Sequence, residues 1–137
     1  AGYVKGVAFD PLGRFLACMS DGVGAVSRPH ATLFECPDTP GLGRESSAWR
    51  ILPLSQSPWD KPGPLTAGIN FRRPSWDPLG QSVAFPFGER KNCEMSSSRF
   101  YAALFAQPWS APKLYRGHKQ HISVVQFAPV VFGSCDE

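Results

Sequence analysis

The stretch Arg116–Pro129, RGHKQHISVVQFAP, contains the pattern that decides the fold. A Gly-His turn is followed by three apolar residues, Ile122, Val125 and Phe127, and then by Ala128-Pro129. Apolar residues at such spacing, closed by a proline, are typical of a short strand that ends in a turn. The stretch is therefore predicted to open a strand-rich unit.

The same apolar spacing occurs twice upstream. In the first copy Val4, Val7 and Phe9 precede Asp10-Pro-Leu-Gly13, and in the second Phe71, Pro74 and Trp76 precede Asp77-Pro-Leu-Gly80. Three copies of one spacing in 137 residues indicate an internal repeat, which decides the fold class before any single element does.

The first copy predicts a β-hairpin. Tyr3–Phe9 and Phe15–Ser20 are rich in apolar residues suited to strands, and a turn over residues 10–13 joins them. Proline presets φ at the first central position of this turn, and glycine tolerates the geometry of its exit. Val23–Ser27 and Ala31–Phe34 are predicted as two further short strands.

The segment from Cys36 to Ala67 has a different composition. It contains six prolines, which remove hydrogen-bond donors from a sheet and prevent helix. We therefore predict a loop or a disordered insertion. Its one apolar island, Ala48–Leu52, is either a strand or anchor against the domain or a short linear motif for a partner.

The second copy predicts a complete four-stranded unit. Its strands are predicted at Gly68–Trp76, Gln81–Phe87, Phe100–Phe105 and Trp109–Tyr115, followed by the turn at Gly117-His118. Pro74 lacks the N–H of a strand residue, so the first of these strands should be strained, bulged or at an edge. Four short strands and a Gly-His turn are the parts of one propeller blade.

The predicted fold is all-β, a fragment of about two blades of a WD-repeat β-propeller. The copies start at Val4, Phe71 and Ile122, so the intervals are 67 and 51 residues, against about 40–45 for a standard blade. The predicted units are a degenerate blade at 1–35, the Pro-rich insertion at 36–67, a second blade with a long internal loop at 68–116, and the truncated start of a further blade at 117–137. We expect the chain to be part of a longer protein.

Three segments resemble a known family. YVKGVAFDPLGRFLACMSD (3–21), INFRRPSWDPLGQSVAFP (69–86) and KLYRGHKQHISVVQFAPVVF (113–132), in this order, are similar to the later blades of the HIRA/HIR histone chaperones. In that family a Val-Lys-Gly strand with an Asp-Pro-x-Gly turn precedes an Arg-Arg-x-Ser-Trp strand. A Trp-containing strand and a Gly-His-x-x-x-Val-x-Val-Val-x-Phe-x-Pro strand follow, with Ile122 here at the first Val.

The sequence also departs from the family pattern. The Trp-Asp dipeptide that usually closes the third strand is absent from that position, where Ser27-Arg28 stands in the first blade, and Gly22 stands near the usual turn aspartate. The side-chain network that rigidifies a typical blade cannot form completely. The propeller subunit of chromatin assembly factor is a related candidate, but Trp109 and the pattern over Gly117–Pro129 favour HIRA.

The resemblance implies a non-catalytic interaction scaffold that acts in replication-independent nucleosome assembly and transcriptional repression in the nucleus. The expected partners are histones and other histone-chaperone subunits. Alternatives are the related chromatin assembly factor subunit, a generic WD-repeat adaptor in a ubiquitin ligase or signalling complex, and a propeller-fold enzyme. The enzyme would need convergent polar residues at the central channel.

Composition gives little support to other functions. The net charge is +3 without a Lys/Arg run, and Arg72-Arg73, predicted as exposed positions beside a strand, is too small a basic cluster for nucleic acid. We expect no direct sequence-specific nucleic-acid binding. No apolar run approaches the roughly 18 residues of a membrane-spanning helix, so no membrane association is expected either. The absence of a secretory signal favours an intracellular, reducing compartment.

No catalytic, cofactor-binding or metal-binding residue is predicted. The four cysteines, Cys18, Cys36, Cys93 and Cys135, form no Cys-x-x-Cys pair, and Cys18 is expected to behave as a small buried apolar residue. His118 is predicted to be structural and His121 exposed. Asp10 and Asp77 occupy equivalent turns and are predicted to form turns rather than an acid–base pair. No residue is assigned to partner binding.

Overall fold

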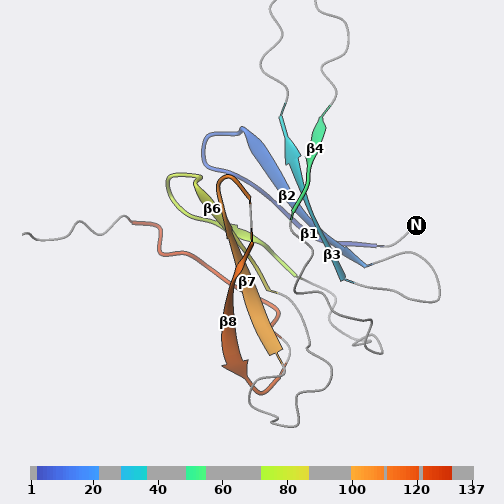
Figure 1. The fold of residues 1–137 in the computed structure, drawn as a ribbon, viewed down its shortest axis with the longest axis vertical. Coiled ribbons are helices and arrows are strands. Elements are labelled where there is room, and N and C mark those ends of the chain that lie inside the picture. The colour runs from blue at the N-terminus through green and yellow to red at the C-terminus, as the bar shows by residue number, and fades with distance from the viewer. Residues whose placement is uncertain are drawn as a thin grey trace, which may run out of the picture.

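The computed structural model of the chain describes residues 3–21, 29–36, 49–54, 72–86, 100–109, 111–120 and 122–130. These residues form eight strands in two four-stranded antiparallel sheets, which stand beside each other in Figure 1. Over these ranges no segment is helical. A search of the same ranges for helices long and apolar enough to cross a membrane finds none.

The first sheet contains β1 (Val4–Phe9), β2 (Phe15–Asp21), β3 (Pro29–Glu35) and β4 (Arg50–Leu52), in that order across the sheet. The predicted hairpin is confirmed, with Phe9 opposite Leu16 and Ala8 opposite Ala17. The strand predicted at Ala31–Phe34 is present and is longer than predicted. The strand predicted at Val23–Ser27 lies outside the described residues.

The strand β4 comes from inside the Pro-rich segment. It pairs with β3 through Leu33 opposite Leu52 and Phe34 opposite Ile51. Arg50 Nε donates to Glu35 Oε2 across the pair at 2.7 Å. The apolar island is therefore a strand, as one of its two interpretations predicted, and it supplies the outer strand of the first sheet. Residues 37–48 and 55–67 lie outside the described residues.

The second sheet repeats this plan. It contains β5 (Ser75–Trp76), β6 (Ser82–Phe85), β7 (Phe100–Ala106) and β8 (Lys113–His118), again in chain order across the sheet. Each sheet is thus a four-stranded antiparallel meander, the architecture of a propeller blade. The chain is an all-β fragment of about two WD-type blades.

Several predicted boundaries in the second sheet are wrong. The first strand, predicted at Gly68–Trp76, is only Ser75–Trp76 among the described residues, since residues 72–74 are not part of it. Trp109 does not begin the fourth strand but lies in the preceding turn, with a φ of 66° and a buried side chain. The strand starts only at Lys113, directly after Pro112, which cannot donate to the ladder. At its other end β8 continues through Gly117-His118, so these two residues end a strand and the bend follows at Lys119-Gln120.

The three copies of the repeat lie side by side at their first strands. Arg72 N donates to Lys5 O at 3.0 Å, so the second copy lies against β1. Arg73 forms an isolated parallel bridge with Val124, and Phe127 N donates to Ser75 Oγ at 3.1 Å, so the third copy lies against the second. Pro74 separates the bridge from the two residues of β5, as expected for a residue without an N–H.

The core lies between the two sheets. Alternate residues of β2 and β3 point at the second sheet, which presents β6, β7 and two tryptophans. The buried apolar cluster consists of Phe15, Ala17, Met19, Ala31, Leu33, Leu54, Trp76, Val83, Phe85, Ala103, Phe105 and Trp109.

The opposite face of the first sheet is apolar and exposed. Val7, Phe9 and Ile51 are all exposed, and the ring of Trp49 lies 6.1 Å from that of Phe9. Leu16 and Cys18 lie opposite Phe9 and Val7 in the ladder and share this face. A sheet normally buries such a face against a further layer.

Expressed alone, the 137-residue segment should aggregate or be partly unfolded, because this apolar face meets water and attracts other copies. Analytical ultracentrifugation and thermal melts over a range of concentrations test this. A monomer with a cooperative, concentration-independent melt would contradict it.

Replacing Gly6 should destabilise the propeller of the intact protein. A Cβ at Gly6 would lie 2.1 Å from Arg72 O, a backbone atom that cannot move without shifting the second sheet. Gly6→Ala should cost about 1–3 kcal/mol, the usual range for overpacking. Ala8→Gly on the same strand is the matched control for a change of one methyl group. Equal melting temperatures for Gly6→Ala and the unmodified protein would show that the close approach is absent.

Candidate functional site

The two Asp-Pro-Leu-Gly turns have the same backbone geometry. Gly13 N donates to Asp10 O at 3.0 Å, and Gly80 N donates to Asp77 O at 3.1 Å. The glycines have φ values of 69° and 65°, in the left-handed region that other residues rarely adopt. The turn chemistry predicted from the repeat is therefore present at both positions.

The two aspartates hold these turns with their side chains. Asp10 Oδ1 accepts a hydrogen bond from Phe15 N at 2.8 Å, and Asp77 Oδ1 accepts one from Gln81 N at 2.8 Å. Each carboxylate thus bonds the backbone where the next strand begins. Both act as turn residues, as the repeat predicts.

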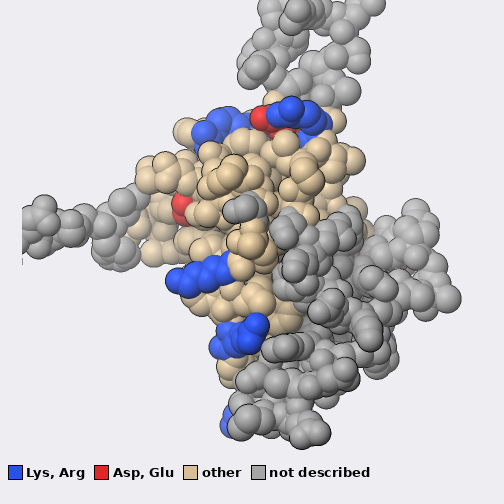
Figure 2. Space-filling model, in the orientation of Figure 1, with Lys and Arg blue, Asp and Glu red and all other residues tan. Residues whose placement is uncertain are grey.

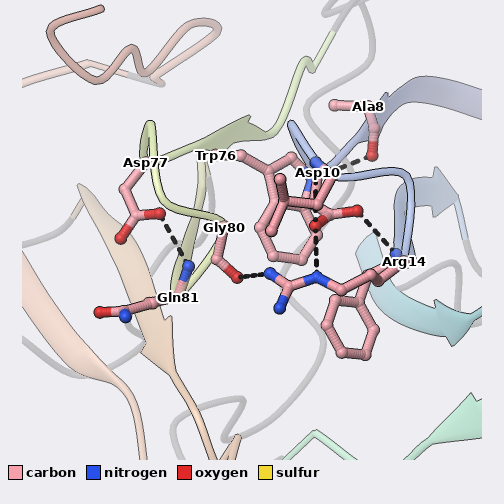
Figure 3. Close-up of polar contacts among 9 residues, drawn as sticks. Ala8, Asp10, Arg14, Trp76, Asp77, Gly80 and Gln81 are labelled. Atoms are coloured by element: carbon pink, nitrogen blue, oxygen red, sulfur yellow. Dashed lines mark hydrogen bonds and ion pairs between the residues drawn. The ribbon is translucent and has the colours of Figure 1, made fainter. Parts of the chain in front are cut away.

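Arg14 joins the two turns to each other. Its Nε donates to Asp10 Oδ2 at 3.1 Å, and its Nη2 donates to Gly80 O at 3.0 Å (Figure 3). The Asp10 side chain has no exposed surface, whereas that of Arg14 is 44% exposed. A Cβ on Gly80 would lie 2.6 Å from Arg14 Nη2 and 2.8 Å from Asp10 Oδ2, so a side chain there would displace these two groups. We call this arrangement the turn bridge.

Beneath the turn bridge three aromatic rings fix the angle between the sheets. Phe15 stacks on Trp76 with ring centres 6.0 Å apart, and Trp109 meets each of them edge-on at 5.4 and 5.8 Å. Trp76 Nε1 also donates to Ala8 O at 3.0 Å, so its one polar atom is satisfied across the junction (Figure 3). Such a junction holds neighbouring turns in constant relative positions.

An aliphatic side chain projects from the same place in each copy. Leu12 is 64% exposed, Leu79 is 53% exposed, and Val130, at the equivalent position of the third copy, is 53% exposed. We call these three residues the aliphatic rim. A turn usually carries Asp, Asn or Ser at such a position, so three aliphatic residues there are the clearest candidate contact surface among the described residues.

Sequence reasoning missed the aliphatic rim. The signal was available, since Leu12 and Leu79 occupy identical turns and Val130 follows Ala128-Pro129 at the same offset. Turn chemistry alone predicts only the backbone role of these residues. The exposure of an apolar side chain at a turn is what marks a surface rather than a core.

The other residues considered from the sequence are spread over the fold. His118 is exposed at the end of β8, and His121 lies outside the described residues. Within the described ranges no group of three or more His, Cys, Asp or Glu residues could hold a metal ion. The predicted exposure is correct for Arg73 and wrong for Arg72, which is 6% exposed because it lies between the first strands of two copies.

Of the cysteines, Cys18 and Cys36 are free thiols of intermediate exposure. Burial raises the pKa of the Cys18 thiol, which favours the protonated and less reactive form. The low reactivity is as predicted for a small apolar residue, although Cys18 is of intermediate exposure rather than buried. Cys93 and Cys135 lie outside the described residues.

The chain is similar along nearly its whole length to proteins named HIR1. It is 31% identical over 136 residues to Protein HIR1 of Mycosarcoma maydis, with 98% of this chain and 11% of that protein covered. The chain is a relative of the HIR1 proteins. Protein HIR1 of Kluyveromyces lactis is 30% identical over 131 residues, with 95% of this chain and 13% of that protein covered. No protein-family model matches the chain.

The HIR1 relationship also extends to a more distant protein. Protein hir1 of Schizosaccharomyces pombe is 26% identical over 135 residues, with 95% of this chain and 11% of that protein covered. The chain therefore spans about an eighth or less of the length of these curated relatives. The similarity includes the Pro-rich segment, which the family resemblance inferred from motifs did not cover.

The two equivalent aspartates should respond differently to the same substitution in the intact protein. Asp10→Asn would place an amide NH₂, at a side chain with no exposed surface, against the donors Arg14 Nε and Leu12 N, which should cost about 1–3 kcal/mol. Asp77→Asn keeps an oxygen for Gln81 N at an exposed turn and should cost less than about 0.5 kcal/mol. Denaturation of both variants followed by tryptophan fluorescence measures the difference. Equal stability losses would mean that the turn bridge does not join the sheets.

Proposed function

We propose that the intact protein is a histone-chaperone subunit of the HIR type. It acts as a non-catalytic scaffold in replication-independent nucleosome assembly and transcriptional repression in the nucleus. Its partners are histones and other subunits of the chaperone complex. The observation that supports this most directly is the similarity to HIR1 proteins over 95–98% of the chain at 26–31% identity.

The geometry of the described residues supports a scaffold role. Asp10 is fully engaged by two backbone amides and Arg14, so its charge serves the architecture. The aromatic junction buries Phe15, Trp76 and Trp109 and holds adjacent turns rigidly. A partner that contacts the aliphatic rim then meets side chains whose positions are fixed beforehand, which lowers the entropic cost of binding.

The chromatin assembly factor propeller subunit and a generic WD-repeat adaptor remain the alternatives of the same fold class. They differ from a HIR-type protein in what they assemble with, not in how the blades are built. The matches to HIR1 proteins favour the HIR-type subunit. The proteins that co-purify with the intact protein therefore distinguish a HIR-type subunit from these alternatives.

The test uses the intact protein, tagged in its own cell and purified with its partners. Mass spectrometry should identify histones and further chaperone subunits. The purified complex should deposit histones on a non-replicating plasmid, measured as negative supercoils in the presence of topoisomerase. Recovery of ubiquitin-ligase or signalling subunits without histones would contradict the proposal, as would absence of supercoiling from a complex that contains histones.

The aliphatic rim should contribute to partner capture. The double variant Leu12→Ser, Leu79→Ser removes two exposed apolar side chains, so co-purification of the partner that docks there should fall by about tenfold, with the melting temperature unchanged. Tyr3→Ser, an exposed residue away from the turns, is the matched control. Unchanged recovery of every partner with the double variant would show that the rim is not a docking surface.

A further inference from the structure

The outer strand of the second sheet, β8, has one edge that no described strand pairs with. It is the last strand in the sheet order, and five of its six residues are exposed. An exposed strand edge presents N–H and C=O groups that another extended chain can pair with. The edge is therefore a potential binding site for a peptide backbone.

The side chains along this edge carry charge of one sign. Lys113 and Arg116 lie on β8, and Lys119 follows in the bend. Figure 2 shows basic side chains over the region where Figure 1 draws β8, whereas the acidic side chains visible in that view lie higher. The described ion pairs are Arg14–Asp10 and Arg50–Glu35, and neither involves these three cations. The sequence contains no Asp or Glu from residue 95 to residue 135.

The equivalent edge of the first sheet is different. β4 has only three residues, and its Arg50 is paired with Glu35 of the neighbouring strand. That edge is short and its charge is neutralised. The basic, six-residue edge is thus a property of the second blade rather than of the repeat.

We propose that β8 binds an acidic, extended segment of a partner protein, which joins the second sheet as an additional strand. This inference goes beyond the proposed chaperone function and does not depend on it. Backbone hydrogen bonds would supply the pairing. Because side chains alternate between the two faces of a strand, carboxylates on one face of the segment would meet Lys113 and those on the other face would meet Arg116, with Lys119 just beyond β8. The same lysines repel a second copy of β8, so the edge discriminates against self-association while accepting an acidic strand.

The register of β8 limits where the segment can pair. Tyr115 lies opposite Ala102, but His118 lies opposite Phe100, so β8 has one extra residue between these points. Gly117 lies in this bulge with a φ of 104°. Because a bulge interrupts the ladder, regular pairing is confined to Lys113–Arg116. Within that range Lys113 Nζ lies 5.5 Å from the centre of the Tyr115 ring, so one face of the site combines an aromatic surface with a cation.

A peptide fits these observations better than a nucleic acid does. A phosphate backbone would also be attracted by three cations, but it cannot pair with the N–H and C=O groups of a strand edge. A nucleic-acid site would also want a wider basic patch with interleaved aromatic residues. The backbone edge is what selects a protein partner here.

The test measures binding of a fluorescein-labelled peptide of four Glu-Val repeats to the intact protein by fluorescence anisotropy. Binding should weaken with added salt, because exposed charges are screened. A peptide of four Lys-Val repeats should not bind. A Glu-Val peptide with every backbone amide N-methylated keeps its charges but loses its donors, so its affinity should fall at least about tenfold. Equal affinity for the methylated peptide would overturn strand addition.

Protein variants locate the site. Arg116→Glu should weaken binding of the Glu-Val peptide by about tenfold, whereas Arg50→Glu, the same charge change on β4, should leave it unchanged. Both positions are exposed, and a cooperative thermal melt of each variant confirms that neither is misfolded. An equal effect of the two variants would overturn the assignment to β8. Tighter binding of a single-stranded oligonucleotide than of the Glu-Val peptide, with the same dependence on Arg116, would overturn the choice of a protein partner.

Discussion

The stacking of Phe15 on Trp76, closed at the edge by Trp109, is the contact on which the rest of this structure depends. Burial of one large apolar side chain stabilises a protein by about 1.5–3 kcal/mol, whereas a typical hydrogen bond contributes about 1 kcal/mol net. The three rings together therefore outweigh the two hydrogen bonds of Arg14. The apolar contact between the rings holds the two sheets together. The hydrogen bonds of Arg14 set the position and orientation of the turn at Asp77–Gly80 relative to the turn at Asp10–Gly13.

This division explains how the surface is presented. The turns that carry Leu12 and Leu79 are fixed from below by the aromatic rings and from the side by Arg14. Two exposed aliphatic side chains would be a poor recognition surface on mobile loops, because ordering them on binding costs entropy. Because the aromatic rings and Arg14 already order these turns in the folded protein, most of that entropy is lost during folding rather than on binding.

Local chemistry made the hairpins predictable. The Asp-Pro-Leu-Gly turns determine their own conformation, so three of the four strands beside them followed from the sequence with errors of one or two residues. The fourth, predicted from Gly68, is confined to Ser75–Trp76 among the described residues, because Pro74 interrupts it. The outer strand β4 was harder to recognise, because its pairing with β3 depends on a partner on the far side of the residues 37–48. The position of Trp109 could not be derived locally at all. Its place in a turn follows from the burial of its ring against Phe15, which is a tertiary contact.

The same distinction applies to the surfaces. The internal repeat identified Asp10 and Asp77 as turn residues, because equivalent residues of a repeat stabilise the same backbone conformation. It did not identify the aliphatic rim, because a spacing pattern does not say which apolar residues remain in water. The burial of Arg72 was missed for the complementary reason, since the contact with Lys5 O comes from a strand 67 positions away in the chain.

The close approach at Gly6 has a consequence for how this protein could have evolved. Gly6, Arg73 and Val124 occupy the same position in the three copies, but only the first copy has glycine there, where an added Cβ would lie 2.1 Å from Arg72 O. A copy of the second or third strand placed first would bring a side chain into the carbonyl of Arg72. The three copies share one sequence pattern, but each fits only its own position in the fold. Exchange of blades by recombination would therefore be selected against, while point substitution at exposed positions could continue.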